Sequence, residues 1–187
     1  MGHIVIISSS IRINRASHRV ALFFKRFISE KQNATSEIVD LNEYKFPIFD
    51  ERLSNQKSPS PKAIEYAGKI KNADGVIIIT PEYNGGYPAS IKNATDLLYA
   101  EWHHKPVGIT TVSNGPFGGS QVIISLQFSL WKMHALVVPA MFPVPNITSA
   151  FDELGNAIDK DSTEKRAGVF LDELFWYIEA NTRMIRK

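Results

Sequence analysis

The run Gly75-Val76-Ile77-Ile78-Ile79, with the loop Thr80-Pro81-Glu82-Tyr83-Asn84-Gly85-Gly86-Tyr87-Pro88 after it, decides the fold. A short, continuous run of β-branched residues is typical of a parallel strand buried on both faces. The loop has a proline near each end and two adjacent glycines, so it is restrained yet can bring its backbone close to a ligand. The segment predicts a buried strand that ends in a rigid binding loop.

Outward from this segment, apolar strand-like runs alternate with stretches of helical periodicity. The other predicted strands are His3–Ile7, Thr35–Leu41, Pro106–Thr110 and Ala135–Val138. The predicted helices are Ser17–Glu30, Pro61–Asn72, Ala89–Ala100, Gly119–Met133 and Thr163–Ala180. The alternation predicts an α/β, flavodoxin-like three-layer sandwich, with a five-stranded parallel sheet of order 2-1-3-4-5 and helices on both faces.

No linker, repeat or low-complexity segment divides the chain, so we expect residues 1–187 to form a single domain. Three proline-rich patches are predicted to be loops. They are Phe46-Pro47, Ser58-Pro59-Ser60-Pro61 and Pro139–Pro145. Ser60 before Pro61 also has the pattern of an N-cap followed by proline in the first helical turn.

Composition excludes several classes of protein. The chain has 187 residues, 44% hydrophobic and 21% charged, which is typical of a globular protein, and it has no cysteine. A cysteine nucleophile and a cysteine-ligated metal are therefore excluded. The net charge of +2 is too small to indicate nucleic acid or an anionic membrane as the main partner. With no signal-peptide pattern and no apolar stretch near ~20 residues, we expect a cytoplasmic protein.

Ligands of such a sheet bind at the carboxyl ends of the strands, where the strand order reverses. The loop after the first strand, Ser8–His18, leads into a helix whose N-terminus favours an anion. Ser10, Arg12 and Ser17 are the best candidates for phosphate contacts, because hydroxyls and an arginine fork donate to phosphate oxygens. Arg15 and His18 are additional candidates, and an ordinary polar loop in which Ser17 caps the helix is the alternative.

The loop after the third predicted strand suits a planar heterocycle. Its backbone N–H groups can reach ring carbonyls and nitrogens, Tyr83 and Tyr87 offer apolar faces, and Asn84 offers a donor and an acceptor. The alternative is a rigid turn whose aromatic side chains pack on the next helix. The loop after the fourth strand, Ser113–Ser120, is rich in glycine and would lie beside the other two loops.

The motif Pro81-Glu82-Tyr83-Asn84-Gly85 with Tyr87-Pro88, then Lys92-Asn93-Ala94 and Asp96, resembles the signature of the NADPH-dependent FMN reductases. That family includes quinone and chromate reductases and some azoreductases. Its first-loop pattern is matched by Ser10, Arg12 and Ser17, although Ser9 stands where the family commonly has glycine. The resemblance covers about the first two thirds of the chain.

This resemblance implies FMN as cofactor and NADPH or NADH as electron donor. It implies an acceptor such as a quinone, a flavin, an azo dye or a metal oxyanion, and a homodimer or homotetramer. It also implies these flavin-ring contacts: Pro81, Glu82, Tyr83, Asn84, Gly85, Ser113, Asn114, Gly115 and Gly118. No residue is expected to act as a general acid or base, because the flavin performs the redox step.

The alternative function is a non-enzymatic, flavodoxin-like electron carrier or redox-responsive flavoprotein. A flavodoxin-type carrier is usually acidic, whereas this chain is slightly basic. The five histidines show no metal-ligand spacing, so no metal site is expected. A hydrolase is also disfavoured, since no G-x-S-x-G nucleophile elbow is present.

Overall fold

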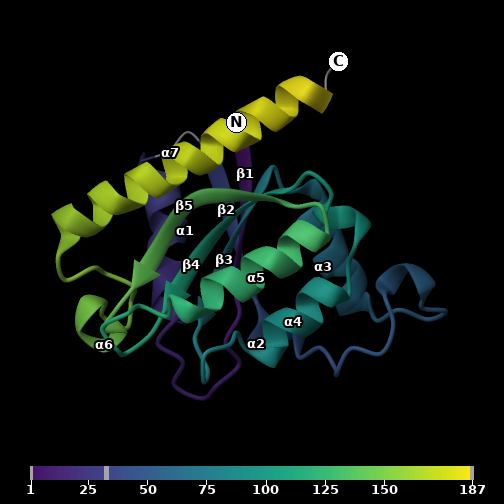
Figure 1. Ribbon diagram of the computed structural model, residues 1–187, viewed down its shortest axis with the longest axis horizontal. Coiled ribbons are helices and arrows are strands. Elements are labelled where there is room, and N and C mark those ends of the chain that lie inside the picture. Colours follow the sequence, from purple (N-terminus) through teal and green to yellow (C-terminus); the bar gives the residue numbers. More distant parts are fainter. Residues whose placement is uncertain (1, 32–33, 186–187) are drawn as a thin grey trace.

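A computed structural model describes residues 2–31 and 34–185. Its centre is a parallel sheet of five strands in the order β2-β1-β3-β4-β5 (Figure 1). The strands are β1 (Gly2–Ser8), β2 (Ala34–Asp40), β3 (Gly75–Pro81), β4 (Pro106–Val112) and β5 (Leu136–Val144). The predicted fold class and strand order are confirmed.

Helices cover both faces of this sheet. The longer ones are α1 (His18–Lys31), α3 (Pro61–Asn72), α4 (Ala89–Asp96), α5 (Gln121–Lys132) and α7 (Lys160–Ile185). Short turns of helix are α2 (Leu41–Tyr44), α6 (Ile147–Ala150) and the 3-10 segments η1 (Leu53–Asn55) and η2 (Ala100–Trp102). No helix of the described residues is both long enough and apolar enough to cross a membrane.

The core consists of two apolar layers separated by the sheet. Because side chains of a strand alternate between its faces, Ile4 and Ile6 of β1 pack with α1 and α7, whereas Val5 and Ile7 pack with α3, α4 and α5. All four side chains are fully buried. Burial on both faces explains the continuous apolar runs of the central strands β1, β3 and β4.

Two helix boundaries follow from local chemistry. Ser60 caps α3 by accepting a hydrogen bond from the Ala63 N–H at 3.2 Å, as its position before Pro61 predicts. The helix expected over residues 89–100 ends earlier, at Asp96. The chain there turns to bury Trp102 completely, and the indole Nε1 donates to the Thr95 carbonyl at 3.1 Å.

The prediction of a loop over Pro139–Pro145 was wrong, because β5 continues to Val144. β5 is an edge strand, and an edge strand tolerates proline where the missing N–H would face away from its neighbour. The register against β4 shifts between Val107 and Ile109. Phe142 and Val144 are both buried, so this irregular strand still contributes to the core.

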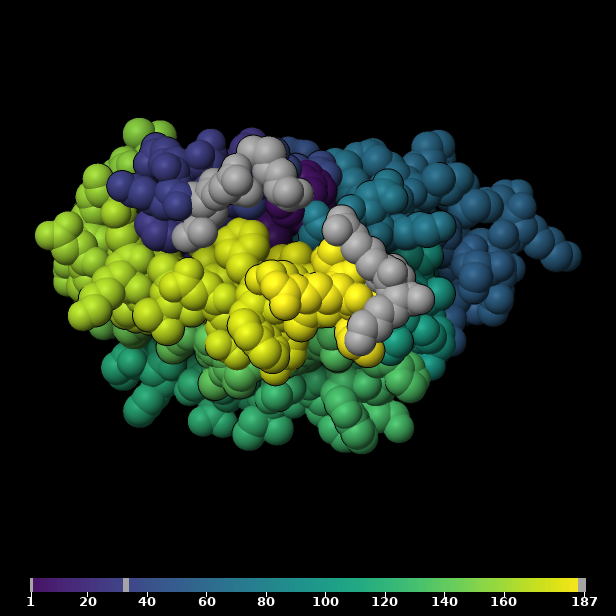
Figure 2. All heavy atoms as spheres, turned by 90° about the horizontal axis from the view of Figure 1, so that it is seen from above, coloured from purple at the N-terminus to yellow at the C-terminus, as the bar shows by residue number. Residues whose placement is uncertain are grey.

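Helix α7 lies across one face of the molecule (Figure 2). It approaches the sheet closely where the strands carry glycine. A Cβ on Gly108 would lie 2.5 Å from Phe170 Cζ, and a Cβ on Gly75 would lie 2.7 Å from Ile178 Cδ1. The loops after β1, β3 and β4 meet at the edge of the sheet that is formed by the carboxyl ends of the strands.

Candidate functional site

The three loops surround one cavity of about 510 Å³, which we call the three-loop cavity. Most of the predicted site residues line it. They are Ser10, Arg12 and Ser17 after β1, Pro81, Glu82 and Tyr83 at the end of β3, and Ser113 and Asn114 after β4. Four predicted residues do not line it: Asn84, Gly85, Gly115 and Gly118.

One end of this region carries buried hydroxyl groups without partners. Ser17, directly before α1, is 4% exposed, and Ser9 is fully buried, yet neither Oγ atom has a hydrogen-bond partner. Ser17 therefore does not cap α1 with its side chain. Unsatisfied buried hydroxyls are costly, and Ser17, unlike Ser9, also lines the cavity, where a ligand can supply the missing partner. A phosphate at the N-terminus of a 14-residue helix fits this donor set.

The first and second loops are joined across the cavity. Ser10 Oγ and Tyr83 Oη lie 2.7 Å apart, at hydrogen-bond distance. The Arg12 guanidinium carbon lies 5.5 Å from the centre of the Tyr83 ring. Within residues 2–31 and 34–185, the Arg12 side chain pairs with no carboxylate. Arg12 therefore keeps its donors available at the edge of the cavity.

Arg15, by contrast, is occupied. Its guanidinium forms a two-pronged ion pair with Asp40, one contact being 2.7 Å, and it also donates to the Ser10 carbonyl at 3.0 Å. Asp40 in turn accepts from the Asn42 N–H at 3.0 Å. Arg15 thus fixes the first loop to the end of β2, and its role here is to hold the loop in shape.

His18 lies beneath the same loop. Its Nδ1 is 3.0 Å from Ser8 Oγ and 3.7 Å from an Asp40 carboxylate oxygen. Burial lowers the pKa of His18 below 6.5; Asp40 opposes this shift, and the Arg15 charge adds to it. The imidazole is therefore neutral at pH 7 and acts as a hydrogen-bonding group of the loop.

The tip of the second loop is a tight hairpin turn. Tyr83 and Gly86 exchange backbone hydrogen bonds of 2.8 and 3.1 Å. The two residues between them have positive φ, 53° at Asn84 and 80° at Gly85, which is the geometry of a type I′ turn. Asn-Gly is the preferred pair for that turn. Asn84 and Gly85 therefore have a structural reason to be present that is independent of any ligand.

The third loop approaches β5 closely. Gly118 has φ 62°, and a Cβ there would lie 3.1 Å from backbone atoms of Val144 and Pro145. A glycine is therefore required at position 118, because a side chain would collide with the end of β5. Asn114 Oδ1 accepts from Thr148 Oγ1 at 2.7 Å, and Ser113 Oγ donates to the Gly115 carbonyl at 3.1 Å.

Ile147 and Thr148 of α6 also line the cavity, and sequence reasoning missed them. No local motif marks them, because they reach the cavity only after β5 has ended and the chain has folded back. The Ile147 N–H then donates to the Ser113 carbonyl at 3.1 Å.

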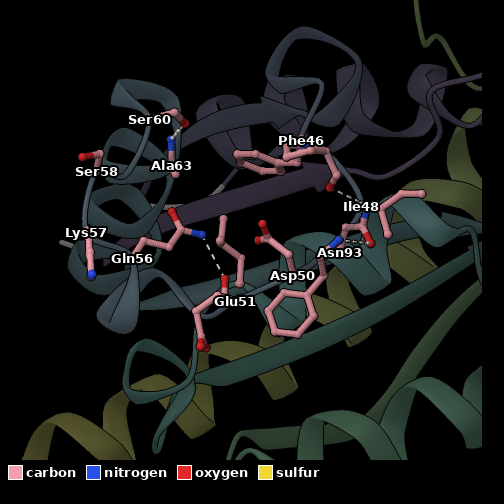
Figure 3. Close-up of a pocket in the computed structure, with 13 residues that line it drawn as sticks. Phe46, Ile48, Asp50, Glu51, Gln56, Lys57, Ser58, Ser60, Ala63 and Asn93 are labelled. Carbon is pink, nitrogen blue, oxygen red and sulfur yellow. Dashed lines mark hydrogen bonds between the residues drawn. The ribbon is translucent and has the colours of Figure 1, made fainter.

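A separate cavity of about 370 Å³ lies between residues 46–60 and α4 (Figure 3). The Asn93 amide donates to the Pro47 carbonyl at 2.9 Å and accepts from the Phe49 N–H at 3.3 Å, so it fastens this segment to α4. The carboxylates of Asp50 and Glu51 line the cavity and disfavour a phosphate. This cavity is therefore a poorer candidate for a nucleotide. The described residues contain no group of three or more His, Asp or Glu placed to hold a metal ion.

The sheet order and the three-loop cavity define a flavodoxin-like, nucleotide-binding α/β protein. The fold agrees with a solved flavoenzyme, FerB, an NAD(P)H:(acceptor) oxidoreductase from Paracoccus denitrificans. The TM-score is 0.77, the identity 22%, and 97% of this chain and 99% of that chain are covered.

Residues 3–149 match the family model described as NADPH-dependent FMN reductase, and the chain belongs to that family. It is 36% identical over 135 residues to the NAD(P)H-dependent FMN reductase LOT6 of Saccharomyces cerevisiae, covering 65% of this chain and 70% of that protein. It is 25% identical over 187 residues to a quinone reductase of Pseudomonas putida, covering 95% of each chain. The expected family is confirmed, and with it an FMN-dependent, NAD(P)H-linked reductase in preference to an electron carrier.

Proposed function

We propose that the three-loop cavity binds FMN with its phosphate at Ser10, Arg12 and Ser17. The observation that carries this proposal is the buried Ser17 hydroxyl, which lacks a partner at the N-terminus of α1. Arg12 adds a cation that no carboxylate of the described chain neutralises.

The flavin ring would lie between the second and third loops. In this proposal Pro81, Glu82 and Tyr83 contact one side, and Ser113 and Asn114 contact the other. Asn84 and Gly85 shape the turn that presents Tyr83, while Gly118 lets the third loop lie against β5. FMN held there would supply the hydride-transfer chemistry that links a reduced nicotinamide to an acceptor. The protein would bind and orient the FMN, and backbone carbonyl and N–H groups of the loops would hold the flavin ring.

A quinone is the first acceptor to test, because a relative that spans 95% of the chain is named a quinone reductase. Azo dyes, free flavin and metal oxyanions follow. We also propose that residues 1–187 form a single FMN-binding domain and that the protein acts in the cytoplasm. Either NADPH or NADH would serve as donor.

We also propose that the protein is a homodimer, or a homotetramer built from such dimers. Ile124, Phe128 and Trp131 lie on one face of α5 and are 78%, 60% and 63% exposed. Tyr87 Oη lies 3.1 Å from Ser129 Oγ of the same helix, so this face is tied to the second loop. Sedimentation should give a dimer or tetramer, and Phe128→Lys should give monomers. A monomeric wild-type protein would refute this part.

The central test is anaerobic titration of the purified, FMN-loaded protein with NADPH and NADH. Loss of the flavin absorption band within seconds supports the reductase, and a quinone should then restore it. Arg12→Ala should weaken FMN binding about 10- to 100-fold, because a charge-assisted hydrogen bond is lost. Bound flavin that neither nucleotide reduces would contradict the proposal, as would failure to bind FMN.

A further inference from the structure

A second cavity, of about 520 Å³, adjoins the three-loop cavity at the first loop. The two share Arg12, Ile13, Asn14 and Arg15 in their walls. The second cavity then continues to Ile11, His18, Arg19, Asn42 and Glu153. We call it the arginine cavity, because three arginine side chains line it and the proposed flavin site uses only one of them.

Two guanidinium groups of this cavity, those of Arg12 and Arg19, are not neutralised by a close carboxylate, and Arg19 takes no part in the proposed flavin site. Arg15 is neutralised by Asp40, as described above. Arg19 donates through Nη1 to the Phe151 carbonyl at 2.8 Å. Its nearest carboxylate, Glu153, is 3.9 Å away and 89% exposed, so this pair is weak. Arg12 and Arg19 therefore retain N–H donors and most of their positive charge.

A guanidinium group suits a phosphate monoester, which offers three acceptor oxygens and a charge of about −2. Arg19 can supply such a group here, with Arg12 shared between this phosphate and that of FMN. The N-terminus of α1 and the Ser17 hydroxyl suit the FMN phosphate, so the arginine cavity is free for a second phosphate-bearing ligand. In a reductase of this family that ligand is the dinucleotide that delivers electrons. NADPH and NADH differ by one phosphate monoester, on the adenosine 2′ position.

We propose that the arginine cavity receives the 2′-phosphate of NADPH and that Arg19 is a specificity-determining residue. This inference rests on the proposed function, because it requires the nicotinamide to reach a flavin in the three-loop cavity. It adds a residue outside that cavity and a preference for NADPH over NADH. Arg19 lines the arginine cavity alone, whereas Arg12 lines both cavities, so a substitution of Arg19 tests the arginine cavity without removing a proposed FMN contact.

The test is steady-state kinetics of Arg19→Gln with each nucleotide. The value of kcat/KM should fall about 10- to 100-fold with NADPH, the loss expected for a hydrogen bond to a charged group, and less than about twofold with NADH. Equal losses with the two nucleotides, or no loss with either, would overturn the proposal.

Arg26→Gln is a matched control on the same helix. Arg26 donates to the Gly155 carbonyl at 2.9 Å, so it holds the segment after α6 much as Arg19 does, but it lies outside the arginine cavity. Its substitution should leave the ratio of the two kcat/KM values unchanged. If Arg26→Gln shifted that ratio as strongly as Arg19→Gln, the effect would be structural and the proposal wrong.

A binding measurement tests the cavity without turnover. Calorimetry on the FMN-loaded protein should show that 2′,5′-ADP binds more tightly than 5′-AMP, and that Arg19→Gln removes this difference. Equal affinities in the wild type would overturn the proposal even if the enzyme is an active reductase. Preference for 2′,5′-ADP in a protein that neither nucleotide reduces would place the failure in the proposed reaction instead.

FAD provides the last arm, since its adenylate phosphate could occupy the same cavity. The apoprotein should bind FAD no more tightly than FMN, with the same affinity in Arg19→Gln. Tighter binding of FAD that disappears in Arg19→Gln would assign the arginine cavity to FAD and overturn the proposal.

Discussion

Replacing Ser17 with alanine should change stability and cofactor affinity in opposite directions. In the FMN-free chain the Ser17 hydroxyl is buried without a partner, and such a group costs about 1–3 kcal/mol. Ser17→Ala removes that cost, so the free energy of unfolding of the apoprotein should rise by about 1 kcal/mol. For a chain of this length the melting temperature would rise by about 2–4 °C.

In the proposed FMN site, the same substitution removes a donor to the phosphate. A hydrogen bond to a charged group contributes about 1.5–3 kcal/mol, which corresponds to a Kd weakened about 10- to 150-fold. Urea denaturation of the apoprotein gives the stability. Quenching of FMN fluorescence on binding gives the affinity. General damage to the fold would lower both the stability and the FMN affinity, so a rise in stability together with a loss of affinity excludes it.

Thr110→Val is the matched control. Thr110 in β4 is also fully buried, its Oγ1 also lacks a partner, and it lies outside the three-loop cavity. It should stabilise the apoprotein similarly and leave FMN affinity unchanged. A loss of stability in Ser17→Ala would mean that the hydroxyl caps α1 in the free protein. FMN affinity equal to that of Thr110→Val would refute the phosphate assignment.

Three further perturbations test the surrounding structure. Gly85→Val places a β-branched residue at φ 80°, which costs about 1–2 kcal/mol, and it should speed FMN release in stopped-flow measurements. Gly86→Ala is the control: a Cβ there has no contact under 3.8 Å, so the release rate should not change. Asp40→Ala leaves the largely buried Arg15 charge unpaired and should lower the free energy of unfolding by about 3–5 kcal/mol in urea; a loss under 1 kcal/mol would contradict the clamp. Because the folded pKa of His18 lies below its unfolded value of 6.5, the unfolded chain binds the proton more tightly, so stability is complete above pH 6.5 and falls as the pH drops below it. Urea melts from pH 5 to 8 should show this slope, reduced in His18→Gln; an equal slope in the variant would exclude His18 as its source.

The fold was predictable because the central strands can be recognised from their own amino-acid pattern. The apolar run 75–79 and the runs of β1 and β4 are buried on both faces, and such burial leaves an apolar pattern that a single sequence can show. The end of β5 left no such pattern. Pro139 and Pro143 predict a loop locally, and only the position of β5 at the sheet edge makes them compatible with a strand.

The candidate site was predictable to the extent that it follows from topology. The loops at the switch point are fixed by strand order, so Ser10, Arg12, Ser17 and Tyr83 could be placed together in advance. The turn-forming role of Asn84 and Gly85 could also be predicted, since Asn-Gly is the preferred pair of a type I′ turn. These two residues were instead interpreted as ligand contacts. Thr148 could not be found, because its position depends on how the chain folds back after β5.

The two prolines of β5 also limit how copies of this chain can meet. An exposed strand edge is a template on which another chain can add its own strand, and continued addition leads to aggregates. Pro139 and Pro143 have no N–H donor, so β5 offers an added strand fewer backbone hydrogen bonds than an ordinary edge strand would. Sheet extension across this edge is thereby discouraged, which agrees with the proposal that copies of the chain meet through the exposed face of α5 in a closed assembly of defined size.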